Sequence, residues 1–181
     1  MSNYKRLKLE GGTYFFTIVT YKRQAVFDIP ECIKHLRASI KETRRTYPFV
    51  IDAWVLLPEH MHCIWTLPDN DNNYSRLWGL IKQGFTKRAK GILPEQSNSL
   101  SRIKHREASV WQRRFWEHEI RDEEDLNHHI DYIHYNPVKH GYVKRVQDWP
   151  FSTFHRYVTE GVYPVDWAGD DLDDYMHEYG E

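Results

Sequence analysis

Two histidines, His60 and His62, stand one residue apart in the stretch PEHMHCIWTLP, residues 58–68, which is otherwise typical of a buried strand. Side chains alternate between the two faces of a strand, so both imidazoles should lie on the same face. At that spacing their nitrogens can converge on one metal ion. Two solvated histidines on a half-exposed sheet face are the competing interpretation, and the short pattern alone leaves both open.

The identity of such a metal is narrowed by the motifs that the sequence lacks. It contains no C-x-x-C pair, no H-E-x-x-H motif and no zinc deaminase signature, and its two cysteines are Cys32 and Cys63. A sulfur-rich site is therefore excluded. Two imidazoles and an oxygen ligand would suit Mg²⁺ or Mn²⁺ acting on a phosphate, or Zn²⁺.

A second reactive group is predicted within HHIDYIHYNP, residues 128–137. Residues three or four apart share one face of a helix, which places His129, Tyr132 and Asn136 together. The Asn136 amide oxygen can bind a cation, and the Tyr132 phenol can act as a nucleophile. The alternative is structural: Tyr132 is a core aromatic and Asn136 ends the helix before Pro137.

The predicted elements place these residues in an α+β fold. Hydrophobic patterning predicts four strands and three helices, in the order strand 11–21, helix 30–46, strand 48–58, strand 60–68, helix 74–89, strand 109–120 and a helix from Asp122 to about Pro137. This order indicates a ferredoxin-like (split βαβ) antiparallel sheet with helices on one face. The other face, carrying the histidine pair, should be open. The last helix carries Tyr132, and the aromatic segment 149–157 should pack back on the sheet.

Composition and charge predict one globular domain with a tail. The 181 residues are 40% hydrophobic and 15% aromatic, without a membrane span or a secretory signal, which indicates a cytoplasmic protein. Residues 166–181 contain seven acidic residues and no Lys or Arg, whereas residues 1–165 have a charge of +6. We therefore expect a domain over 1–165 and an acidic tail over 166–181. The basic domain is compatible with a polyanionic partner or with ordinary surface charge.

The chain resembles the REP-associated tyrosine transposases, relatives of the single-tyrosine HUH transposases of bacterial insertion sequences. The resemblance covers roughly residues 4–168 and is carried by WVLLPEHMHCIW (54–65), FWEHEIRDEEDLNHHIDYIHYNPVKHGYV (115–143) and DWPFSTFHRYV (148–158). It implies that Tyr132 is the nucleophile and that His60 and His62 bind the metal. Asn136 stands where the related enzymes place an amide as the third ligand.

The resemblance also implies a reaction. A tyrosine oxygen attacks a phosphodiester of single-stranded DNA, forms a 5′-phosphotyrosine and releases a 3′-OH, and the reverse attack rejoins strands. Mg²⁺ or Mn²⁺ is the expected cofactor. Because the pKa of tyrosine is near 10, Tyr132 should need activation by the ion or by a base such as His129. The sequence leaves both routes open.

The implied partner is a REP-type DNA hairpin with a short single-stranded guide, in a nucleoid-associated protein of the cytoplasm. A monomer is favoured, although related enzymes form dimers that exchange the tyrosine helix. Candidate DNA contacts, each of which could also be a solvated side chain, are Tyr4, Lys5, Arg6, Arg113, Arg114, Lys139, His140, Lys144 and Arg145. The acidic tail would compete with DNA for this basic surface.

Two other function classes remain open on sequence grounds. One is a single-stranded nucleic-acid-binding module without catalysis, although no RNP-type run such as GFGFV is present. The other is a metal-dependent hydrolase that uses water as its nucleophile. Tyr132 discriminates among the three, because only the transposase forms a covalent bond to it.

Overall fold

The structure is a computed structural model that describes residues 10–93 and 110–168. Its strands and α-helices are β1 (Thr13–Val19), α1 (Pro30–Thr46), β2 (Val50–Leu56), β3 (His60–Thr66), α2 (Tyr74–Arg88), β4 (Trp116–Glu119), α4 (Glu123–Lys139) and α5 (Phe154–Thr159). The strands form one antiparallel sheet in the order β2-β3-β1-β4. This order confirms the ferredoxin-like fold. Tyr4, Lys5, Arg6 and the tail beyond residue 168 lie outside the described residues.

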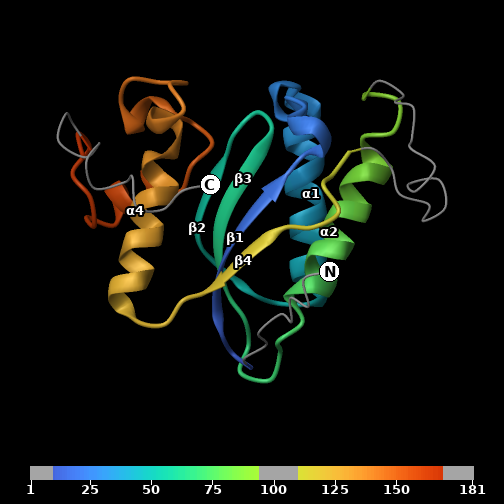
Figure 1. The fold of residues 1–181 in the computed structure, drawn as a ribbon, viewed down its shortest axis with the longest axis horizontal. Helices are drawn as coiled ribbons and strands as arrows, with labels where there is room; N and C mark the ends of the chain where they lie inside the picture. Colours follow the sequence, from blue (N-terminus) through green and yellow to red (C-terminus); the bar gives the residue numbers. More distant parts are fainter. Residues whose placement is uncertain (1–9, 94–109, 169–181) are drawn as a thin grey trace, which may run out of the picture.

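One face of the sheet packs against α1 and α2 (Figure 1). Met61, Cys63 and Trp65 alternate along β3 and are completely buried on this side. Burial of a large apolar side chain contributes about 1.5–3 kcal/mol, so this face supplies much of the stability of the fold. The predicted alternation along β3 is confirmed, and the opposite set of side chains, with both histidines, faces the other way.

The other face of the sheet is not open, contrary to the prediction from sequence. Helix α4 covers it, on the side opposite to α1 and α2 (Figure 1). Ile130 and Ile133 of α4 pack with Phe15, Val55 and Ile64 of the sheet in a second apolar cluster. These isoleucines are three residues apart and therefore share the inward face of α4. The helix was expected from the sequence, but the surface it covers was not.

The connections beside β2 agree with the predictions. Residues Pro58 and Glu59 form a tight hairpin turn, closed by a hydrogen bond of 2.9 Å from the Leu57 N–H to the His60 carbonyl. Further along the chain, Phe151 accepts a backbone hydrogen bond of 2.9 Å from Leu56 at the edge of β2. The aromatic segment therefore returns to the sheet before α5 begins.

The predicted beginning of the fourth strand is wrong. Arg113 and Arg114 do not lie in the fourth strand, because the chain bends after an isolated bridge at Trp111 and β4 begins only at Trp116. Helix α4 was expected to end near Pro137, and it ends two residues further along, at Lys139. A proline so close to the end of a helix removes one N–H donor from the last turn, and the helix tolerates this loss.

Candidate active site

The two histidines of β3 lie side by side and completely buried. Their ring centroids are 4.9 Å apart, and each is oriented through Nδ1 by a different neighbour. His60 Nδ1 donates to Glu59 Oε1 at 2.9 Å, and His62 Nδ1 lies 2.9 Å from Thr17 Oγ1 on β1. A carboxylate on Nδ1 fixes the tautomer that presents Nε2 as the basic nitrogen. Metal-binding histidines commonly have such a partner.

Helix α4 and its C-cap residue place three residues, spaced four apart in the sequence, on the side of this pair. The Tyr132 ring centroid is 5.2 Å from that of His62, and the His140 ring centroid is 5.1 Å from that of His60. Asn136 is four residues from each of them along the helix, and it is completely buried. By this spacing it lies between the two contacts, on the side of the helix that packs toward the histidine pair. The sequence placed His129, Tyr132 and Asn136 on one face; of these, the structure brings the Tyr132 ring to His62 and puts His129 beside His118 and Asp125.

The Asn136 amide is the observation that favours a metal at this position. In the part of the chain that the structure describes, neither its Oδ1 nor its Nδ2 has a hydrogen-bond partner. Leaving a buried polar group unsatisfied costs about 1–3 kcal/mol, so such a group calls for a ligand. An amide oxygen beside two imidazoles is a donor set that suits Mg²⁺, Mn²⁺ or Zn²⁺. The residues present therefore fit the expected ion.

The phenol ring of Tyr132 is almost buried, at 6% exposure, in the same cluster. Phe15 contacts it at 6.0 Å between ring centroids. The ammonium nitrogen of Lys139, on the exposed end of α4, lies 4.8 Å from the Tyr132 ring centroid. A cation at this distance can hold an anionic phosphate near the phenol. The arrangement thus combines a potential nucleophile, a cation and three potential metal ligands.

Glu59 and Thr17 are supporting residues that the sequence analysis missed. In addition to its hydrogen bond with His60, Glu59 accepts a hydrogen bond of 3.0 Å from the Tyr142 hydroxyl. Its carboxylate also lies 3.7 Å from the Arg23 guanidinium. Burial, followed by this bond to Glu59, raises the pKa of Tyr142 to about 12. The place of Glu59 next to His60 in the sequence was a usable signal. Thr17 had a weaker one, since it interrupts the apolar part of its strand, and only the β1–β3 register pairs it with His62.

His129 lies in a neighbouring cluster with His118 and Asp125. Its Nδ1 donates to the Asp125 carbonyl at 2.8 Å, and His118 Nε2 lies 2.8 Å from Asp125 Oδ2. Arg121 also donates to this carboxylate, through its backbone N–H at 3.0 Å and its side chain at 3.2 Å. Burial lowers the pKa of His129. Burial by itself raises the pKa of Asp125, but the hydrogen bonds from His118 and Arg121 outweigh this effect and lower the pKa to about 2.

This second cluster could also hold an ion, because ligand atoms of His118, Asp125 and His129 lie within 4.8 Å of one another. Its polar atoms are, however, already used. The Nδ1 proton of His129 points at a carbonyl, and the Asp125 carboxylate accepts from two side chains and a backbone N–H. A metal would have to replace these bonds. We therefore regard the cluster as a hydrogen-bonded support for α4 and favour the histidine pair as the metal centre.

The predicted DNA contacts within the described residues are distributed around the site. Lys139, the last residue of α4, and His140, its C-cap, lie directly beside the site, and Lys144 is exposed in the following turn. Arg145 is exposed and forms an ion pair with Asp148 at 2.8 Å. Arg113 and Arg114 are exposed in the bend before β4, at the opposite edge of the sheet from β2. No helix in the described ranges is long and apolar enough to cross a membrane.

Comparison with known proteins identifies the family. A family model described as IS200-like transposase matches residues 9–136. A REP-associated tyrosine transposase from Escherichia coli (strain K12) is 49% identical over 173 residues, covering 96% of this chain and 94% of that protein. A solved structure of a REP-associated tyrosine transposase bound to a REP hairpin matches with a TM-score of 0.80 and 48% identity, covering 96% of this chain and 94% of that one. The chain therefore belongs to the REP-associated tyrosine transposases, enzymes of the IS200-like transposase family.

Proposed function

We propose that this protein cleaves and rejoins single-stranded DNA at REP-type hairpins through a covalent bond to Tyr132. The observation that carries the proposal is the position of the Tyr132 ring, 5.2 Å from the His62 ring and one helical turn from Asn136. Neither a binding module nor a hydrolase that uses water requires a phenol at this point. The family of the chain and the relative solved with a REP hairpin support the same reaction and partner.

The reaction exchanges one phosphodiester for another. The Tyr132 oxygen bonds to the phosphorus and loses its proton, while the bond from phosphorus to the 3′ oxygen breaks and that oxygen leaves as a hydroxyl. Attack by a 3′-OH reverses the steps and restores Tyr132. Because the energy of the broken bond is kept in the phosphotyrosine, the reaction needs no external energy source. His129 remains a candidate to accept the proton, since its lowered pKa keeps the ring neutral at pH 7.

His60, His62 and Asn136 would hold a divalent cation, Mg²⁺ or Mn²⁺, at this site. The chemistry that such an ion supplies is stabilisation of negative charge on a phosphate oxygen. Glu59 and Thr17 orient the two imidazoles, and Lys139 binds the phosphate from the exposed side of Tyr132. Both histidines are completely buried, which keeps bulk water away from the two imidazoles.

The DNA partner accounts for the basic surface around the site. Lys139, His140 and Lys144 follow one another from the end of α4 and are our first candidates for phosphate contacts, with Arg113, Arg114 and Arg145 more distant. Tyr4, Lys5 and Arg6 remain candidates to read bases. We retain the monomer as the expected active form, and a nucleoid-associated cytoplasmic location follows from the proposed DNA partner.

The proposal is tested by trapping the covalent intermediate. The full chain is incubated with a single-stranded REP-type hairpin and Mg²⁺ or Mn²⁺, and the products are separated on a denaturing SDS gel. We expect a protein–DNA adduct that Tyr132→Phe abolishes. Tyr135→Phe, a change to a neighbouring buried tyrosine of the same helix, is the matched control and should retain the adduct. DNA cleavage without any adduct would instead indicate a water nucleophile.

A further inference from the structure

A row of aromatic rings leads away from the candidate site toward the edge of β2. Each ring contacts the next one in the row. The distances between consecutive ring centroids are 5.1 Å from His60 to His140, 6.1 Å from His140 to Tyr142, 5.5 Å from Tyr142 to Trp149 and 5.9 Å from Trp149 to Phe151. These are ordinary spacings for aromatic contacts. Tyr142 is 40% exposed, and Trp149 and Phe151 are half-buried, so the row reaches the surface. The proposed cleavage reaction makes no use of its outer part.

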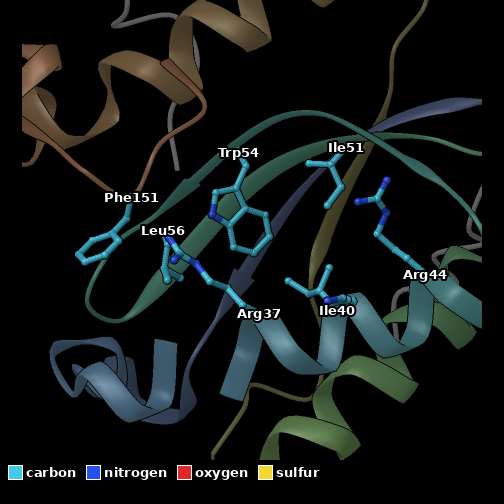
Figure 2. A pocket seen from close by; sticks show the side chains of 8 residues that line it. Arg37, Ile40, Arg44, Ile51, Trp54, Leu56 and Phe151 are labelled. Atoms are coloured by element: carbon cyan, nitrogen blue, oxygen red, sulfur yellow. The ribbon is translucent and has the colours of Figure 1, made fainter. Parts of the chain in front are cut away.

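The row ends in a groove between α1 and the β2 edge, where Trp54 and Phe151 line a cavity of about 280 Å³. Three exposed cations of α1, Arg37, Lys41 and Arg44, form its rim, and none of its lining residues is acidic. Figure 2 shows the Trp54 ring directed from β2 toward α1, with Phe151 at one end of the groove. The groove thus combines an aromatic floor with a positively charged wall.

The groove and the candidate site lie on opposite faces of the sheet. On β2, Trp54 pairs with Cys63, whose side chain faces α1 and α2, whereas the next residue, Val55, pairs with His62 on the α4 side. The ring row connects the two faces around the β2 edge. At the end of the row, the Arg37 guanidinium carbon lies 6.0 Å from the Phe151 ring centroid, within cation–π distance.

We propose that this groove, which we call the α1–β2 groove, binds a second segment of single-stranded DNA. Bases stack on Tyr142, Phe151 and Trp54, and the cations on the rim of the groove bind the backbone phosphates. An unpaired strand can present its bases to protein rings, whereas a duplex keeps them stacked on one another. At about 280 Å³ the cavity lies just below the size range of ligand pockets, roughly 300–1,000 Å³, which suits a single base. The inference rests on the single-stranded partner proposed above, but not on the cleavage chemistry.

The ring row is tested by binding of a fluorescent oligothymidine of roughly 20 nucleotides, longer than the about 4–16 nucleotides that one small domain occupies. All variants carry Tyr132→Phe, and no metal is added. Phe151→Leu and Tyr142→Leu should each weaken binding roughly 5- to 100-fold, the range for loss of one stacked base. Tyr142→Phe keeps the ring and should bind within about two-fold of the parent, given the same principle. Unchanged binding by Phe151→Leu would overturn the proposal.

A ring elsewhere on the surface provides the control for these changes. The Arg76 guanidinium lies 4.5 Å from the Tyr47 ring centroid, an arrangement similar to that of Arg37 and Phe151, but neither Arg76 nor Tyr47 lines the groove. Tyr47→Leu should leave the affinity for oligothymidine unchanged. A loss as large as that in Phe151→Leu would mean that any exposed ring contributes, and the assignment of the groove would be wrong.

The charged wall is tested by salt dependence of the same binding. Replacing Arg37, Lys41 and Arg44 with Gln should reduce the slope of log K against log salt by roughly 2, since each phosphate contact on a single strand contributes about 0.7. The matched control replaces three exposed cations outside the groove, Lys34, Arg45 and Lys87. An equal change of slope in both triple variants would overturn the proposal. The covalent adduct at Tyr132 is scored in a separate assay, so failure of the groove and failure of the proposed reaction are distinguishable.

Discussion

At the scale of single residues, the sequence predicted that the two histidines share one face of the strand, but it did not predict what surrounds them there. Alternation along the strand placed His60 and His62 on one face, and β3 confirms it. The prediction of an open face was wrong, because burial depends on α4, which is more than fifty residues further along the chain. The hydrogen-bond partner of His62 could not be predicted either, because Thr17 is brought to His62 only by the register between β1 and β3. Contacts between distant segments were not readable from local spacing.

The proposed metal centre predicts a specific loss of metal affinity. His60→Ala and Asn136→Ala should each weaken Mn²⁺ binding, measured by titration calorimetry, by at least roughly ten-fold. Mutation of a residue that only orients a metal ligand lowers metal affinity by about 10- to 100-fold, so the loss of a ligand itself should lower it by at least as much. Glu59→Gln, which removes the carboxylate from His60, should fall within that range.

The competing cluster provides the control for the metal measurement. His118→Ala removes a potential ligand of the group formed with Asp125 and His129, but leaves the histidine pair intact. We expect Mn²⁺ affinity to be unchanged in this variant. Loss of binding in His118→Ala, with normal binding in His60→Ala, would place the ion in the other cluster and contradict our assignment.

A buried histidine away from the site predicts how stability depends on pH. His134 is completely buried, with Nε2 2.9 Å from Thr153 Oγ1, and burial, followed by the charge of Arg156, lowers its pKa to about 3. The unfolded chain, with a histidine pKa of about 6.5, therefore binds a proton that the folded protein does not. The free energy of unfolding should fall as the pH is lowered below 6.5, by up to about 1.4 kcal/mol per pH unit.

Urea unfolding between pH 7 and pH 5 measures this effect. His134→Gln retains a polar group for Thr153 but cannot be protonated, so its stability should depend less steeply on pH than that of the parent. His35→Gln, at a partly exposed histidine of α1 on the other face of the sheet, is the control and should keep the slope of the parent. Parallel pH profiles for the parent and His134→Gln would contradict the assigned cause.

At the scale of elements, α4 carries the site. Its last turns carry Tyr132 and Asn136, its C-cap is His140, and the rings of Tyr132 and His140 contact the two histidines. Hydrophobic patterning predicted this helix from Asp122, and its beginning at Glu123 agrees with that prediction. The fourth strand was predicted too long, because the aromatic residues before Trp116 satisfy a strand pattern but pack beyond the sheet: Trp111 contacts Phe27 and Phe85. Local propensity cannot separate these two uses of an aromatic residue.

The beginning of α4 provides a stability prediction. The Asp122 carboxylate accepts a hydrogen bond of 2.8 Å from the Asp125 N–H and caps the helix. Asp122→Ala should lower the free energy of unfolding by about 1 kcal/mol, the usual effect of losing an N-cap. Glu124→Ala removes an acidic residue from the same turn without removing the cap and should cost less. Equal losses in the two variants, measured by denaturant unfolding, would show that charge rather than capping matters here.

At the scale of the whole molecule, helices cover both faces of the sheet, and the two faces have different roles. Helices α1 and α2 build the larger apolar cluster, and α4 brings its functional side chains onto the second face. The order of elements was sufficient to predict the ferredoxin-like sheet. The aromatic segment 149–157 was also predicted to return to the sheet. What could not be predicted is that residues 151–153 meet the β2 edge and bring the ring row together with the α1–β2 groove.

The charge of the molecule predicts an effect of the C-terminal residues on DNA binding. Residues 169–181 carry six acidic side chains and no Lys or Arg, so their removal changes the formal net charge from −1 to +5. We expect a chain ending at residue 168 to bind single-stranded DNA more tightly at low salt, with the gain shrinking as salt screens the charges. Fluorescence anisotropy at two salt concentrations measures this. Equal affinity of the two chains at low salt would contradict the expected competition.

The central claim, that the Tyr132 oxygen forms the bond to DNA, is tested most directly by locating the modified residue. The adduct formed with a single-stranded REP-type hairpin is digested with nuclease and protease, and its peptides are analysed by mass spectrometry. We predict a nucleotide joined through its 5′-phosphate to Tyr132, and to none of the other eleven tyrosines. A 5′-nucleotide on Tyr135 or on any residue other than Tyr132 would contradict the account.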